Sequence, residues 1–196
     1  MGRRSDHSRA ELESLIVTEG HALMAEVGFA RFSAREVAKR IGYSVGTVYN
    51  VMGTHDRLML SINTLTFRLW AEHLRSRLAD RPDDRIAALV GGYFSFAREN
   101  TNLWMAIYDH RPPAGEPMPE DYAAERGELT GIVAAEIARV LPPTRVGEAP
   151  ALARSLVATV HGHCFFELNG TFALLGEKEP QSTALLRVRE SLAAAV

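Results

Sequence analysis

The chain has 196 residues, 46% hydrophobic and 23% charged, a composition typical of a soluble globular protein rather than a disordered or collagen-like one. The longest mostly apolar stretch without a charge, residues 86–97, is too short to cross a bilayer. The polar start gives no reason to expect a secretory signal. Cys164 is the single cysteine and cannot form an intramolecular disulfide, so we expect a protein of the reducing cytoplasm, without a membrane partner.

The net charge of −2 averages over two unlike parts of the chain. Residues 1–53 carry seven Lys and Arg against six Asp and Glu, whereas the rest is acidic. Arg3, Arg4 and Arg9 form a short basic arm, which favours polyanions such as DNA through counterion release. A solvated, frayed terminus explains the same charges, so the arm alone does not decide the function.

Apolar residues follow a helical spacing through almost the whole chain, with glycines and prolines at the breaks. Gly28, Gly42 and Gly53 end the first three helices, and Ser33 with Glu36 is typical of a capping box at the start of the second. No alternating strand pattern is present. The sequence predicts an all-α fold of about nine helices, over residues 9–27, 34–40, 45–51, 54–79, 83–99, 101–109, 119–141, 149–175 and 181–195.

Two short helices joined by Gly42-Tyr43-Ser44 have the layout of a helix-turn-helix, whose second helix presents its first residues to base edges in the major groove. Thr47 offers a hydroxyl for phosphate, Tyr49 can donate to a phosphate oxygen, and Asn50 can pair with adenine. An ordinary three-helix cap explains the same spacing. The candidate DNA-binding residues from this pattern are Ser33, Val45, Gly46, Thr47, Tyr49 and Asn50.

The stretch from Ala30 to Leu58, with residues 25–29 before it, resembles the DNA-binding domain of the tetracycline-repressor (TetR) family. The shared features are Gly28-Phe29 after the first helix, Ser33 with Arg35 at the second, and residues 42–49 through the turn and third helix. The resemblance covers roughly a quarter of the chain. It implies a helix-turn-helix DNA-binding domain over residues 1–53, and it adds Arg35, Ser44 and His55 to the candidate DNA-binding residues.

This sequence departs from the family pattern at a few of these positions. The family usually has an aromatic where Met52 stands, and commonly a Lys where His55 stands, as a phosphate contact. A His side chain is mostly uncharged near pH 7, so we expect a weaker or pH-dependent contact there. Asn50 and Val51 replace a commoner His or aromatic pair, so we expect a changed operator sequence.

The C-terminal part resembles the branch of the family that is named for a Trp-His-Gly motif. Val160-His161-Gly162 stands in place of the motif, and aromatics over residues 91–110 recur at that branch's spacing. The resemblance implies a ligand-binding and dimerisation helical bundle over residues 54–196. Aromatics at helical spacing are usually part of the core, and that explanation stays open for each candidate. The candidate pocket residues are the large amphipathic ones: Phe67, Trp70, Tyr93, Phe94, Trp104, Tyr108, His161 and Phe165.

A stripe of mostly small residues on the helix over 149–175 allows another helix to approach closely. In the family the last two helices pair with those of a second subunit. These small residues could instead pack against the helix over 54–79, and that alternative stays open. The candidate dimer contacts are Ser155, Thr159, Gly162, Phe166, Gly170, Ala173, Leu185 and Leu192.

The resemblance implies a ligand-responsive transcriptional regulator, most often a repressor in this family. It is expected to bind a near-palindromic double-stranded DNA operator as a homodimer and to be released by a small-molecule effector. We expect no cofactor and no metal, because His161 and Cys164 share one helix face whereas His163 and Glu167 share another. We also expect no enzyme, because paired carboxylates and a nucleophile–base arrangement are missing. A protein-interaction module that no longer reads DNA is the alternative, which the missing Lys at position 55 keeps open.

Overall fold

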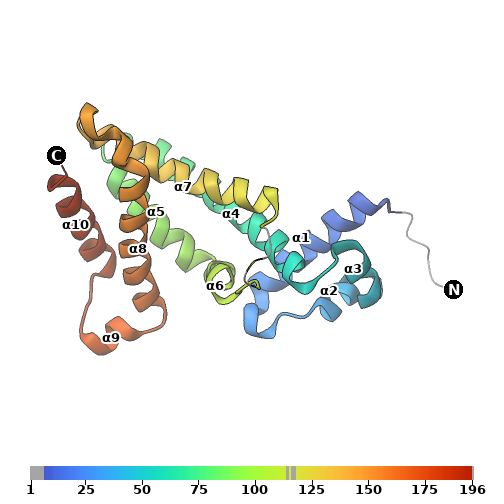
Figure 1. Cartoon of the computed structure of the whole chain (residues 1–196). Helices are drawn as coiled ribbons and strands as arrows, with labels where there is room; N and C mark the ends of the chain where they lie inside the picture. Colours follow the sequence, from blue (N-terminus) through green and yellow to red (C-terminus); the bar gives the residue numbers. More distant parts are fainter. Residues whose placement is uncertain (1–6, 114, 116–117, 196) are drawn as a thin grey trace. The chain divides into compact units, whose positions relative to one another are not determined.

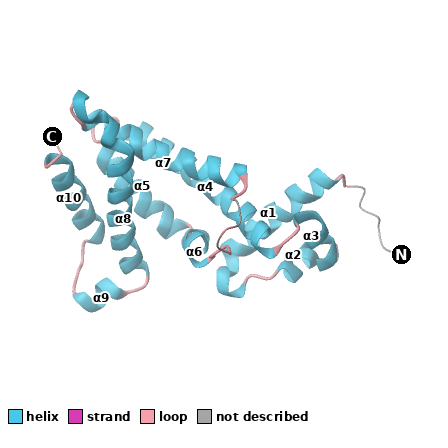
Figure 2. Ribbon diagram, viewed as in Figure 1, coloured by secondary structure: helices cyan, strands magenta, loops and turns pink. Residues whose placement is uncertain are grey.

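The computed structural model describes residues 7–113, 115 and 118–195, and these contain α-helices and two 3-10 helices but no strand (Figures 1 and 2). The all-α fold class is therefore confirmed. Arg3 and Arg4 of the basic arm lie outside the described residues. The elements are α1 (Arg9–Val27), η1 (Phe29–Arg31), α2 (Ala34–Arg40), α3 (Val45–Met52), α4 (His55–Asp80), α5 (Arg85–Glu99), α6 (Thr101–Asp109), α7 (Glu120–Val140), η2 (Pro143–Glu148), α8 (Ala149–Leu168), α9 (Thr171–Leu175) and α10 (Pro180–Ala193).

The expected helix boundaries agree with these bounds to within two residues, except in the last third of the chain. There the helix expected over 149–175 divides at Asn169-Gly170 into α8 and α9. Gly170 has a φ of 80°, a left-handed conformation that an α-helix does not contain. The described residues thus hold ten α-helices rather than about nine.

The capping box expected at Ser33 is wrong. Ser33 is the N-cap of α2, but its side chain makes no capping hydrogen bond. The backbone N–H of Glu36 donates to the Ser33 carbonyl (3.0 Å). The Glu36 side chain pairs with Lys39. The same Ser-x-x-Glu spacing does form a capping box at Ser8 and Glu11, which opens α1.

Packing divides the chain into two compact units. The first holds the residues up to Thr66 together with Asn102–Ala123, and its core joins α1, α2 and α3 to the first half of α4 and to α6. Val37, Val48 and Leu58 are completely buried in this core. Because α4 and α6 share one core with the helix-turn-helix, the packing units do not follow the functional boundary expected after residue 53.

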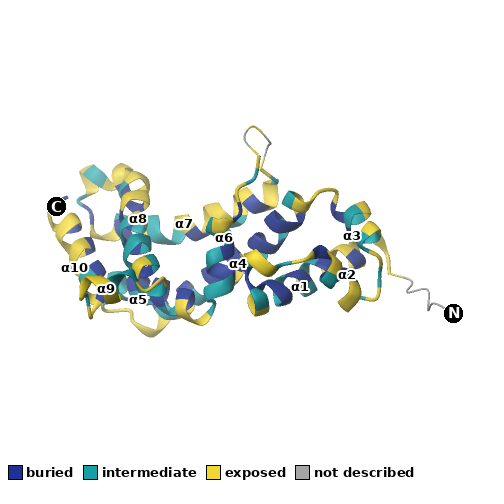
Figure 3. Ribbon diagram, turned by 90° about the horizontal axis from the view of Figure 1, so that it is seen from below, coloured by how far each residue is buried: buried dark blue, intermediate teal, exposed yellow. Residues whose placement is uncertain are grey.

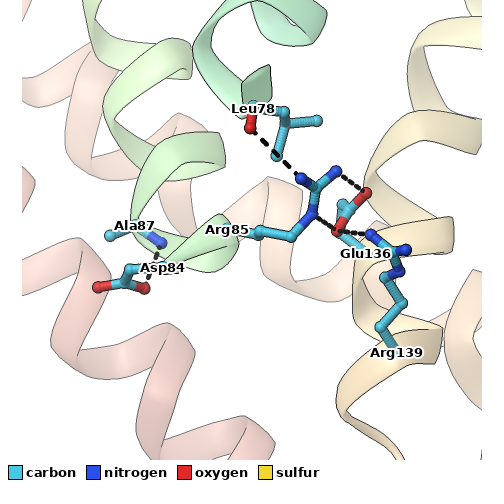
Figure 4. Close-up of polar contacts among 6 residues, drawn as sticks. All are labelled: Leu78, Asp84, Arg85, Ala87, Glu136 and Arg139. Atoms are coloured by element: carbon cyan, nitrogen blue, oxygen red, sulfur yellow. Dashed lines mark hydrogen bonds and ion pairs between the residues drawn. The ribbon is translucent and has the colours of Figure 1, made fainter. Parts of the chain in front are cut away.

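The second unit holds Phe67–Thr101 and the residues from Ala124 onward. Its α10 packs against α8 and α5, and the ring of Trp70 stacks on Phe96 with centroids 5.0 Å apart. The Arg85 guanidinium donates two hydrogen bonds to the Glu136 carboxylate (2.5 and 2.7 Å) and a third to the Leu78 carbonyl, which ties α5 to α7 and α4 (Figure 4). In the described part of the chain, no helix has both the length and the apolar character needed to span a membrane.

Candidate nucleic-acid interface and ligand-binding bundle

The short helix α3 is oriented by its buried side and by its capped N-terminus. Val48 is completely buried, and Met52 is 2% exposed beside Leu58. Ser44 caps the helix, since its hydroxyl accepts a hydrogen bond from the backbone N–H of Thr47 (3.0 Å). An eight-residue helix is not stable alone in water, so these contacts hold it in place.

Arg9 holds the other end of α3. Its guanidinium donates to the carbonyl of Val51 (3.0 Å) and to that of Asn50 (3.3 Å), in the last turn of the helix. A cation is favourable beside these carbonyls, because the C-terminus of a helix carries a partial negative charge. Arg9 is the first residue of α1 rather than part of a free arm, and sequence reasoning did not identify this role.

All nine candidate DNA-binding residues are at least partly accessible to solvent. Val45, Thr47 and Tyr49 are half-buried, and the outward side of α3 is visible in Figure 3. The exposed members are Ser33, Arg35, Ser44, Gly46, Asn50 and His55. Their contacts with DNA stay a prediction.

The two departures from the family pattern have different surroundings. Met52 fills a core position among apolar side chains that include Met59, so it takes the packing role expected of an aromatic residue. His55 is the exposed first residue of α4, and its ring centroid lies 6.3 Å from that of Phe32. The Thr54 hydroxyl caps α4, as expected, by accepting from the backbone N–H of Arg57 (3.1 Å).

Helix α6 is attached to the helix-turn-helix core by a polar contact at each end. The Asn102 amide donates to the Ala25 carbonyl at the end of α1 (2.7 Å). The buried His110 ring bonds the carboxylate of Asp56 in the first turn of α4 (2.9 Å). Sequence reasoning missed both pairs, because partners 77 and 54 residues apart leave no local pattern.

The candidate ligand-pocket residues differ in their surroundings, and their contact with a ligand stays a prediction. A partly open cavity of about 40 Å³ lies among α5, α7, α8 and α10, and Tyr93 is the one candidate among its ten lining residues. His161 bonds the Tyr93 hydroxyl (3.0 Å). Phe67, Trp70 and Phe94 are buried, Phe165 is half-buried and stacks with His161, and Trp104 and Tyr108 belong to the other compact unit.

Two of the His, Cys and Glu side chains on α8 have partners other than a metal. His163 bonds the Thr159 carbonyl (2.9 Å), and Glu167 pairs with Arg98. Burial raises the pKa of the Cys164 thiol to about 12. Among the described residues, no group of three or more potential ligands is placed to hold a metal ion.

The candidate dimer contacts on α8 and α9 are accessible. Ser155, Phe166, Gly170 and Ala173 are exposed, and Thr159, Gly162 and Leu185 are half-buried. A Cβ added at Gly162 or Gly170 would meet no heavy atom within 4 Å, so neither glycine packs closely against α4 within the described chain. Leu192 differs from the rest, because it is 6% exposed and belongs to the buried core of the chain itself.

Comparison with known proteins bears on both halves of this arrangement. Residues 16–51 match the family described as bacterial regulatory proteins, tetR family. Residues 86–188 match the tetracyclin repressor-like C-terminal domain, and this match alone covers more than half of the chain. The chain belongs to the TetR family. Membership assigns it to regulatory proteins rather than to enzymes, while the Trp-His-Gly branch stays a prediction.

Relatives of known sequence carry names of the same kind. Over 139 residues the chain is 27% identical to the HTH-type transcriptional regulator Rv1816 of Mycobacterium tuberculosis, and equally to Mb1846 of Mycobacterium bovis. The match covers 69% of this chain and 58% of each relative, so the chain spans less than two thirds of their length.

Three solved structures show the same fold. A Rhodococcus sp. RHA1 protein has a TM-score of 0.74 at 16% identity and covers both chains fully. A TetR transcription regulator from Haloarcula marismortui has a TM-score of 0.61 at 18% identity, over 95% of this chain and 98% of that one. The multidrug binding protein EbrR, complexed with imidazole, has a TM-score of 0.59 at 19% identity, over 97% and 96%.

Proposed function

We propose that this protein is a ligand-responsive transcriptional regulator that binds a near-palindromic DNA operator as a homodimer and is released by a small-molecule effector. In this proposal residues 1–53 form the DNA-binding domain and residues 54–196 the ligand-binding and dimerisation bundle. The observation that carries it is the outward side of α3, which exposes Gly46 and Asn50 while Ser44 and Arg9 hold the two ends of the helix.

The mechanism follows from the spacing of the two recognition helices. Two copies of α3 would enter successive major grooves of one DNA face, roughly 34–36 Å apart. An effector that binds better to a dimer with another spacing shifts the population away from the DNA-binding form. Release of the operator then relieves repression, as expected of a repressor.

Helix α6 offers a route for this coupling. It follows α5 directly in the chain after Asn100, yet it is bonded to α1 and α4 through Asn102 and His110. A ligand that displaces α5 therefore pulls on the first turn of α4, where Asp56 receives the His110 bond. Thr54 and His55, at the start of that helix, would report the movement.

The dimer is proposed to form through the accessible side of α8 together with α9 and α10. The test is Gly162→Leu, because a side chain at this position would keep a partner helix from approaching. Gly131→Leu on α7 is the matched control, since a Cβ at Gly131 also meets no heavy atom within 4 Å. Sedimentation equilibrium should give a monomer for Gly162→Leu and a dimer for Gly131→Leu. A dimer in both variants would place the interface elsewhere.

The DNA-binding role is tested by selecting preferred sequences from a random duplex pool. The wild type should enrich a near-palindrome, Asn50→Ala should relax the preference at one position of each half-site, and Tyr49→Phe should weaken binding at every sequence without disturbing the dimer. Asn100→Ala, in the other compact unit, is the control and should select the wild-type sequence. A wild type that enriches no sequence would favour a protein-interaction module.

A further inference from the structure

The cavity in the second compact unit has an almost purely aliphatic lining. Besides Tyr93 it is lined by Ile86, Leu89, Val90, Val133, Ile137, Leu156, Val157, Val160 and Val188. Ile86, Val133 and Val157 are half-buried whereas the other lining residues are buried, so these three mark the side that is open to solvent. Such a lining favours an alkyl group, because burial of each CH₂ strengthens binding about fourfold.

The charged side chains that flank the lining residues in the sequence are already paired. Figure 4 shows one of these pairs. The Arg85 guanidinium donates two hydrogen bonds to the Glu136 carboxylate, and the Arg139 guanidinium lies 3.6 Å from the same carboxylate. The lining residues themselves carry no charge that could pair with a charged ligand. The three flanking pairs are Arg85–Glu136, Arg187–Glu190 and Arg189–Asp84.

One polar side chain, that of Tyr93, belongs to the lining. Its hydroxyl lies 3.0 Å from Nδ1 of His161, and either atom can be the donor, depending on the imidazole tautomer. The pair can therefore match a ligand hydroxyl or a ligand carbonyl. Burial lowers the pKa of His161, so the imidazole is neutral near pH 7 and offers no cation to a carboxylate.

A second hollow, of about 500 Å³, lies between the ends of α5, α8 and α10 and is polar. Its Arg98 donates two hydrogen bonds to Glu167 (2.6 and 2.9 Å) and one to Gln181 (2.9 Å). These groups satisfy one another on the surface. The aliphatic cavity is therefore the better place for a ligand whose affinity comes from burial.

We propose that the aliphatic cavity is the effector site, and that it takes an uncharged molecule with a short alkyl chain and one hydroxyl or carbonyl group. The proposal rests on the proposed function, because it names the effector of that regulator. A carboxylate or an ammonium group would lose its hydration among aliphatic side chains without gaining a partner of opposite charge in the lining, which disfavours charged analogues of the same length.

The size of the cavity links binding to a change of structure. Its volume of about 40 Å³ is far below the ~300–1,000 Å³ of most ligand pockets. A six-carbon ligand must therefore move α5, α7 and α8 apart. Because it binds only the widened bundle, it shifts the population toward that form.

The proposal is tested with 1-hexanol, hexanoate and hexylammonium, titrated calorimetrically into the full chain at pH 7.5. Hexanol should bind at least about tenfold more tightly than either ion. Tyr93→Phe should weaken hexanol binding about two- to tenfold, since one hydrogen bond is lost. Val157→Phe, which fills the open side, should abolish binding, whereas Val140→Phe, at an exposed position on α7, should not change it.

Three results would overturn the proposal: equal or tighter binding of either ion, no binding of any probe, or hexanol binding that Val157→Phe leaves intact. Circular dichroism of each variant shows whether it is still helical, and so distinguishes a folded variant that has lost the site from one that has unfolded. Operator binding is measured separately with the same samples. Hexanol that binds as expected but leaves operator affinity unchanged supports the site and counts against the proposed regulation, so the two failures are distinguishable.

Discussion

Replacing Met52 by alanine tests whether this side chain fixes the recognition helix. Met52 is 2% exposed, and its core cluster also holds Leu58 and Met59 of α4, so Met52→Ala leaves a cavity in the core that α3 and α4 share. Removing a buried Met costs about 2–5 kcal/mol in the free energy of unfolding. We expect about 2–4 kcal/mol, since a short helix relaxes more than a central one; Met52→Leu should cost less than about 1.5 kcal/mol.

Urea unfolding followed by fluorescence measures this loss in the first compact unit. Trp104 lies in that unit and is completely buried, whereas Trp70 lies in the other, so a Trp70→Phe background leaves one reporter in the right place. Met118→Ala is the matched control, because Met118 is 41% exposed and should cost less than about 0.5 kcal/mol. Equal urea midpoints for Met52→Ala and Met118→Ala would refute the packing role of Met52.

Further predictions concern caps, pH and the thiol. Ser44→Ala should cost about 1 kcal/mol in unfolding free energy because it removes a capping bond, whereas Ser33→Ala, which removes none, should cost almost nothing; equal costs would contradict this. Burial lowers the pKa of His21, His73 and His161, so the unfolded chain binds protons more readily than the folded one. The free energy of unfolding should therefore rise with pH up to the ordinary His pKa near 6.5. A free energy of unfolding that does not change between pH 5 and 7 would contradict this. Cys164, with a pKa of about 12 and no exposure, should react with iodoacetamide only as fast as the chain unfolds; rapid labelling of the native protein would show an open α8.

Local signals were sufficient to predict most of the fold. Gly28 ends α1 with a φ of 73° and Ser44 caps α3, and both roles follow from residue type and spacing. The division of α8 from α9 also has a local signal, because Asn169-Gly170 is a typical turn pair that the continuous apolar spacing concealed.

The features that the sequence did not predict depend on contacts between residues far apart in the chain. The Arg9 bonds to the end of α3 and the His110 bond to Asp56 join segments that only the folded chain brings together. The sequence predicts a ligand site among large aromatics, whereas the cavity lies where aliphatic side chains of four helices leave space between them. Helical spacing identifies a buried face but not a gap within it, which is why Tyr93 was the one lining residue among the candidates.

The most direct test of the account is fluorescence anisotropy of the purified protein with DNA tiles from both sides of its own gene, at two salt concentrations and with competitor DNA. A sequence-specific dimeric regulator should give a tight complex on one near-palindromic tile, with one or two dimers per site, that survives the higher salt. Equal, weak and steeply salt-dependent binding to every tile would contradict it, because contact with phosphates alone gives that result.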